Sequence, residues 1–479
     1  MDQNPNSSSD NSNDPLREFL ESLLGEGAAY DALEAMRTQG FDLSAFPGLG
    51  SPQELSQALG QMRFMMNSST EPVNWRMVDE LSRQQVFQSG DPRLTAAQAQ
   101  GVRQALSVAD LWLDPVTAFA VPGVAREAWS KVEWIDQTLP AWKRICNPIA
   151  ENASRAMADA MQTELGDGHG LPEGMDGLAQ SISSMLPKMA AMAFAAQIGS
   201  ALTEMAKEAL GTTDSGLPLT EGNVTALIPA NLGEFADGLD VPFEEVEQFM
   251  AARECAHARL FASVPWLKHD LLLAIERYSS EISIDQEAIM DAARSVDPSD
   301  PESIELAMSD GVFSSVPTEA QKSAQERLES LLALIEGWVE VVTTEAISPY
   351  LPHANQMREM MRRRRVTGSS GEMLLRRLVG IELRPRHTRS AATIFRRIQE
   401  ADGAEARDAL WSHPDRVPSP SHLAEPETFF DEKPTDPELS ELDSQLSALL
   451  EGTLGFDDSV PKSMRGEEPG SPAGSTEAD

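Results

Sequence analysis

The feature that most constrains the fold is the spacing of apolar residues, which recur every three or four positions over long stretches. This period places apolar side chains on one face of an α-helix. It is found at residues 95–114 and 130–146, and it continues for about eight turns between residues 318 and 347. Alternating apolar and polar residues, which would indicate strands, are almost absent. We therefore predict a mainly α-helical fold, in which helices at 241–262 and 318–347 pack against each other.

Composition divides the chain into three parts. Residues 1–70 begin with a Ser/Asn/Asp-rich stretch and contain one short amphipathic helix and a Gly/Pro/Ser-rich linker, so we expect them to be mostly disordered. Residues 71–412 carry the helical patterns and form the predicted body. Residues 413–479 are rich in proline, acidic and small residues, which predicts a disordered acidic tail. Four leucines of the tail share one helical face, which indicates either a docking helix or a transient helix without a partner: Leu439, Leu442, Leu446 and Leu449.

The charge balance limits the classes of partner. The chain carries 76 acidic and 38 basic residues, a formal net charge of -38, which opposes general affinity for nucleic acid or an anionic membrane. About a dozen arginines gather between residues 357 and 400, but no aromatic residues are interleaved for base stacking. We interpret this segment as a solvated or internally paired face, with nucleic-acid binding as the weakest alternative. A protein or peptide partner fits the composition better.

Three features bear on the compartment. The N-terminus has neither a basic region nor an apolar run typical of a signal peptide, and the chain has only two cysteines. The most apolar segment, residues 184–210, is interrupted by Lys188, Gln197 and Glu204 before about 20 apolar residues accumulate. We therefore expect a buried helix there, no membrane association, and a reducing, cytoplasmic location.

One helical segment contains a near match to a zinc-protease motif. Residues 253–257 read Arg-Glu-Cys-Ala-His, which is HExxH with arginine in the first position. In HExxH the two histidines lie one turn apart and bind zinc, while the glutamate acts as general base. A guanidinium cannot ligate a cation, because it stays protonated and offers no lone pair. Taken alone, the pattern is more typical of a core histidine packed on the face of Phe249, Leu260 and Phe261.

A longer resemblance gives this motif a context. It rests on segments spread from about residue 73 to 415: VNWRMVDELSRQ, VADLWLDPVT, AWSKVEWIDQTLPAWKRICNPIAE, TDSGLPL, ARECAHARLFASVPWLKHDLLLAIERY, LLALIEGWVEVV, LVGIELRPR and RDALWSHPD. In these segments the chain resembles an actinobacterial zincin-like family of proposed zinc-dependent metalloproteases and hydrolases. One branch of that family keeps HExxH, and the branch that this chain resembles reads RExxH. The resemblance implies a multi-helical zincin-like body.

The resemblance also assigns roles to four residues. It places His257 and Glu336 at metal-ligand positions, Glu254 at the general-base position, and Arg253 where the first zinc ligand would stand. Because Arg253 is cationic, it could replace the metal and bridge Glu254 or Glu336.

Three functions follow as hypotheses. The first is a zinc metallopeptidase or hydrolase in which His257, Glu336 and a third group, His269 or His353, hold zinc. The second is a catalytically inactive pseudoenzyme that acts as a protein-interaction or regulatory module. The third is the nucleic-acid binder already judged weakest on charge.

Overall fold

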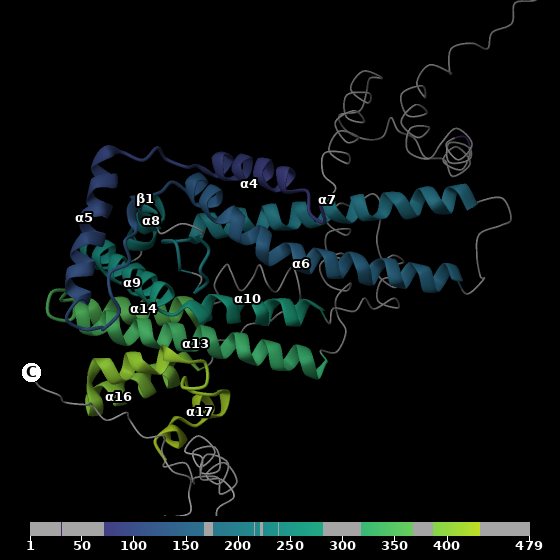
Figure 1. Ribbon diagram of the computed structural model, residues 1–479. Helices are drawn as coiled ribbons and strands as arrows, with labels where there is room; N and C mark the ends of the chain where they lie inside the picture. Colours follow the sequence, from purple (N-terminus) through teal and green to yellow (C-terminus); the bar gives the residue numbers. More distant parts are fainter. Residues whose placement is uncertain are drawn as a thin grey trace, which may run out of the picture. The chain divides into compact units, whose positions relative to one another are not determined.

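The computed structural model describes residues 71–166, 176–214, 216–220, 224–237, 239–280, 318–366 and 387–431, together with Tyr30 (Figure 1). Helices dominate these residues, which confirms the predicted mainly α fold. The long helices are α4 (Trp75–Ser89), α5 (Ala96–Leu113), α6 (Lys131–Gly166), α7 (Asp176–Glu208), α9 (Phe243–Ser263), α10 (Pro265–Ser280), α13 (Glu319–Ile347), α14 (Ala354–Val366) and α16 (Thr388–Ala409). Shorter elements are α8 (Pro229–Asp237), α17 (Pro420–Ala424), and the 3-10 turns η2 (Leu410–Ser412) and η3 (Pro426–Phe429).

The two helices that matter most for the site, α9 and α13, begin and end close to the predicted positions. Thr318 caps α13 by accepting a hydrogen bond from the backbone N–H of Gln321, whose side chain returns a bond to the Thr318 backbone. Pro242 precedes α9, and Glu244 and Glu245 in its first turn complement the positive end of the helix dipole. The two helices pack against each other, as the apolar periodicity predicted.

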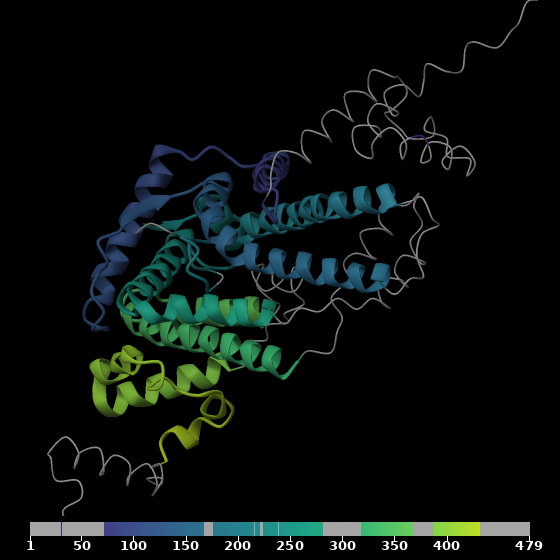
Figure 2. The same ribbon diagram turned by 45° about the vertical axis from the view of Figure 1, so that its right-hand side comes forward.

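Helix α13 lies at the centre of the helices around the site. It packs on α9, α10, α14 and α16, and both views show these helices side by side (Figures 1 and 2). The close approach to α16 requires glycine at position 337, since a Cβ there would lie 2.6 Å from the Cβ of Ala391. The position of Glu336, one residue earlier, is fixed by this close packing.

A small parallel strand pair was not predicted. Strand β1 (Ala125–Ala128) pairs with β2 (Val224–Leu227), with Ala125 opposite Val224. Strand β2 contacts α9, and a single antiparallel bridge joins Leu227 to Gly211. The pair thereby holds the residues that follow α7 beside the site helix.

The segment with the most membrane-like composition, residues 184–210, lies almost entirely in α7. This helix packs on α4 and α6, and Ile198, Leu202 and Met205 are buried. These contacts agree with a buried helix. None of the helices in the described ranges is both long and apolar enough to cross a membrane.

The ordered body runs past residue 412, where the sequence placed its end. Val417 and Leu423 are buried, and α17 contacts α13 and α16. The chain divides into two compact units, Met1–Pro426 and Glu427–Asp479. Residues 1–70, apart from Tyr30, and the four leucines of the tail lie outside the described residues. The predicted disorder of the N-terminal region, and the choice between a docking helix and a transient helix in the tail, therefore stay predictions.

Candidate functional site

Helix α9 presents the RExxH residues to the interior rather than to solvent. Arg253, Glu254 and His257 are 4%, 1% and 1% exposed. Helix α13 runs alongside and contributes Glu336, which is 5% exposed. The spacing of 253 and 257 places both side chains on one face of α9, one turn apart.

Glu336 is shared by Arg253 and His257. The Nη2 of Arg253 donates to one carboxylate oxygen, Oε2, at 2.8 Å. The Nε2 of His257 lies 3.2 Å from the other oxygen, Oε1. The structure thus brings together three of the predicted site residues, and it assigns Arg253 to Glu336, one of the two carboxylates proposed for it.

The histidine ring is oriented by its own helix. Nδ1 of His257 lies 2.9 Å from the carbonyl oxygen of Arg253, one turn earlier. A carbonyl oxygen only accepts, so this bond places a proton on Nδ1. The contact between Nε2 and the Glu336 carboxyl then needs a second proton, held by either partner. Metal-bound histidines show the same backbone orientation of the second ring nitrogen, so the ligand geometry of His257 is kept.

Glu254 has hydrogen-bond partners of its own, separate from those of Glu336. Its Oε2 accepts hydrogen bonds from the hydroxyls of Thr212 and Thr213, at 2.7 and 2.8 Å, and from the Thr213 backbone N–H at 3.0 Å. Burial raises the pKa of Glu254, although the charge of His257 and the two hydroxyls oppose this effect. The carboxyl at the general-base position therefore holds its proton to higher pH than an exposed glutamate.

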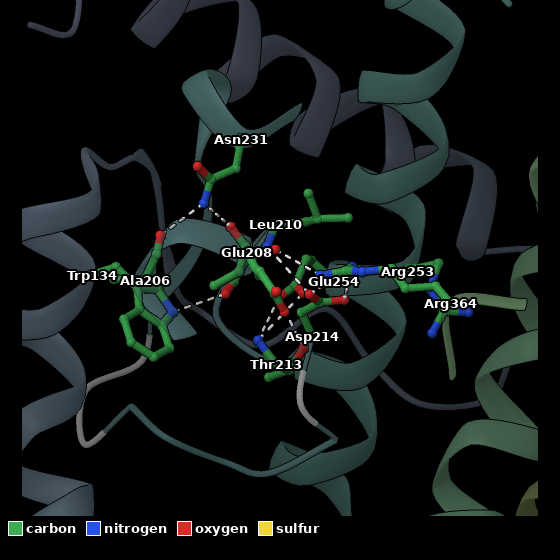
Figure 3. A network of polar contacts seen from close by, with 12 residues as sticks. Trp134, Ala206, Glu208, Leu210, Thr213, Asp214, Asn231, Arg253, Glu254 and Arg364 are labelled. Carbon is green, nitrogen blue, oxygen red and sulfur yellow. Dashed lines mark hydrogen bonds and ion pairs between the residues drawn. The ribbon is translucent and has the colours of Figure 1, made fainter. Parts of the chain in front are cut away.

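The segment that covers Glu254, residues 211–214, is fixed from several sides (Figure 3). A Cβ at Gly211 would lie 2.5 Å from the Glu254 carboxyl carbon, so only glycine fits there. The indole of Trp134 donates to the Gly211 carbonyl at 3.1 Å. Asp214 accepts from the Leu210 N–H at 3.3 Å and pairs with Arg364 of α14 at 2.9 Å.

These covering residues were not predicted as part of the site. TDSGLPL, one of the resembling segments, begins with Thr213 and Asp214. Together with Gly211 and Thr212, which precede it, it supplies the small and hydroxyl residues that suit a turn against a carboxylate. No local sequence pattern predicts that this turn contacts the carboxyl group of Glu254.

The two histidines suggested as a third zinc ligand lie elsewhere. His353 is half-exposed, and its Nδ1 pairs with Glu245 Oε1 at 3.0 Å. His269 is exposed on α10. In the described ranges, no group of three or more His, Cys, Asp or Glu side chains is arranged to hold a metal ion. Both suggestions for the third ligand were therefore wrong.

The residues present do not fit zinc. A catalytic zinc site takes three protein ligands and leaves one position open for water. Here His257 and Glu336 are the only donors at the cluster among the residues described, and the guanidinium of Arg253 already occupies one carboxylate oxygen. The cluster is a buried arrangement of one fixed cation, one carboxylate and one imidazole, and such an arrangement holds α9 against α13.

Comparisons with known proteins place this fold among the zincin-like proteins. The family model of zincin-like metallopeptidases matches residues 73–430, and the chain belongs to this family. A crystal structure from Chloroflexus aurantiacus, described as that of a proposed hydrolase with a novel fold, is similar with a TM-score of 0.52. It is 16% identical and covers 74% of this chain and 97% of its own, which shows likeness of fold. No curated protein matches the chain.

Proposed function

We propose that this chain is a pseudoenzyme of the zincin-like family, in which Arg253 has taken the place of the metal. One observation carries the proposal: Arg253 Nη2 lies 2.8 Å from Glu336, at the position where the family motif would have its first zinc ligand. The proposal includes the finer assignment to the actinobacterial branch that reads RExxH.

Electrostatics supports the replacement. A guanidinium stays protonated at all ordinary pH values, so its charge balances the buried Glu336 carboxylate without a metal. A zinc ion bound to His257 and Glu336 would add two positive charges beside this fixed one, in an interior where charges are poorly screened. Zinc could therefore bind only if the arginine side chain left its buried position.

The surroundings of Glu254 support the same proposal. A general base has to reach the proton that it removes, directly or through one water. Glu254 is 1% exposed and accepts hydrogen bonds from Thr212 and Thr213. A carboxyl that is covered and already engaged by these donors is poorly placed to reach a water molecule.

The alternative function, a zinc metallopeptidase, is favoured by one specific observation. His257 Nε2 and the Glu336 carboxylate lie 3.2 Å apart, so two side chains at ligand positions are still adjacent. The family of the chain is one of metallopeptidases. Metal content separates the two functions.

The experiment is metal analysis of the wild-type protein, purified without chelators, together with a peptidase assay in the presence of added zinc. We expect no stoichiometric zinc and no peptide cleavage. His257→Ala, which removes a ligand position, should leave the zinc content unchanged. One tightly bound zinc per chain that is lost in His257→Ala would establish the metallopeptidase instead.

The proposed role is that of an interaction or regulatory module with a protein or peptide partner in a reducing, cytoplasmic compartment. The compartment is supported by Cys146 and Cys255, which are both buried and unpaired. The tail is the proposed docking device. A chain ending at residue 426 should therefore keep the thermal stability of the body and lose crosslinks to partners that the full chain forms.

A further inference from the structure

A small pocket lies between α9, α13 and α14, next to Arg253. Its polar lining comprises Arg253 from α9, Arg358 and Arg362 from α14, and the α13 residues Glu340, Thr343 and Thr344. Its interior is narrow, with room for about one water-sized body, and it opens to solvent. Arg358 and Arg362 are half-buried and form its accessible side, whereas Arg253 and Thr343 are 4% and 2% exposed.

The side chain of Arg358 is the first indication that a ligand binds in this pocket. Its Nε is buried and makes no hydrogen bond to any residue that the structure describes. Within the described residues its guanidinium has no ion pair, although the neighbouring Arg362 and Arg363 each have one. A partly buried charge without a counter-charge destabilises the fold unless a partner arrives.

Thr343 is a second, independent sign. Its hydroxyl is buried and has no hydrogen-bond partner among the described residues. Helical threonines commonly donate to the carbonyl four residues earlier, and Thr343 does not. An N–H of arginine can only donate, and a threonine hydroxyl can donate as well. One acceptor in the pocket would satisfy both groups.

The charge balance favours an anion over water as that acceptor. Arg253 is matched by Glu336 at 2.8 Å, and Arg362 is matched by Glu340, which accepts from its Nε at 3.0 Å. Arg396 adds a further cation 3.9 Å from Glu340. The positive charge of Arg358 is therefore left over, and a neutral water would not compensate it.

We propose that this pocket binds one oxyanion, a phosphate or a carboxylate group, between Arg358 and Thr343. The narrow part admits about one water-sized body, so one oxygen enters it and the rest of the group faces the half-buried arginines. The proposal goes beyond the pseudoenzyme role and does not depend on whether the protein binds zinc.

The test is thermal unfolding of the full chain with inorganic phosphate, with acetate, and with chloride at matched ionic strength. An oxyanion bound to the native state alone should raise Tm by roughly 2 to 4 °C when it is present at about ten times its Kd. The phosphate and acetate arms distinguish the two sources of the oxyanion. Equal shifts in all three salts would mean screening over a water-filled pocket, and would overturn the proposal.

Three variants identify the site. Arg358→Gln should not lower the basal Tm, because it removes a partly buried charge that has no ion pair among the described residues. It should weaken phosphate binding at least tenfold by titration calorimetry, a loss of about one charge-assisted bond. Thr343→Val should weaken it several-fold. Arg363→Gln removes an exposed arginine of the same helix and should bind phosphate as the wild type does. Equal phosphate affinity in Arg358→Gln and Arg363→Gln would refute the site.

Discussion

Two buried arginines on helix α9 show how differently the same side chain can serve a fold. Arg259 is 1% exposed and Arg253 is 4% exposed. Arg259 donates to several acceptors on α5 and the loop after it: Asp110 Oδ1 and its carbonyl oxygen, Asp114 Oδ1 and the Phe119 carbonyl. Within the described residues, the guanidinium of Arg253 donates to Glu336 alone.

The two sets of contacts suit two different roles: Arg259 joins α9 to α5, whereas Arg253 is proposed to replace a metal ion. The donors of Arg259 are well used, as expected for a residue whose role is to fasten one element to another. Arg253 stands at a ligand position, shares a single carboxylate with His257, and borders a pocket with surplus positive charge. These surroundings are the ones expected under the proposal that the guanidinium has taken the place of a metal ion.

The largest expected effect is that of Arg259→Ala. The change leaves the carboxylate of Asp110 with Arg126 as its remaining partner. It also removes the ion pair with Asp114 and one donor from each of the carbonyl oxygens of Asp110 and Phe119. We expect a loss of about 3 to 5 kcal/mol in the free energy of unfolding, measured by urea denaturation. Arg103→Ala, at an exposed arginine of α5, is the control and should change stability by less than about 0.5 kcal/mol. A loss as small as that in the control would mean that Arg259 does not fasten α9 to α5.

Arg253→Ala should cost less, about 2 to 4 kcal/mol, because Glu336 keeps His257 as a neighbour. Urea denaturation measures this loss. A loss equal to that of Arg259→Ala would remove the distinction between the two arginines.

The smallest expected effect concerns Glu254. It appears as a difference in how the free energy of unfolding changes with pH. Because burial raises its pKa above the ordinary 4.5, the folded state keeps a proton that the unfolded state has released. This contribution to stability is present at low pH and is lost as pH rises above about 4.5. Glu254→Gln, which stays neutral, should therefore gain stability relative to wild type from pH 5 to pH 8. Parallel stability profiles for the two proteins would show that Glu254 titrates normally.

The sequence predicted the helices around the site better than its contacts. The three- and four-residue periods that predicted α9 and α13 are local signals. The resemblance placed Glu336 and His257 in one site, and the 3.2 Å contact confirms that the two side chains are close together. The strand pair escaped prediction because each strand has four residues and pairs across about a hundred others. Contacts made only in the folded state, such as Thr212 on Glu254, leave no periodic signal.

The same reasoning explains the two misplaced features. His353 was considered as a ligand from residue type alone, whereas the structure pairs it with Glu245 at the other end of α9. The proline-rich composition after residue 412 indicated disorder, but Val417 and Leu423 are buried apolar side chains. Isolated apolar residues between prolines give no indication of the surface against which they pack.

Zinc titration of Arg253→His tests most directly whether the arginine occupies the place of the metal. The change removes the fixed cation and adds an imidazole one turn from His257, which with Glu336 completes three ligands and an open position. We expect one zinc per chain in Arg253→His and none in wild type or in Arg253→Lys, which keeps the positive charge. Circular dichroism would check that all three are folded. Stoichiometric zinc in the wild type, or a folded Arg253→His that binds no more zinc than Arg253→Lys, would contradict the replacement.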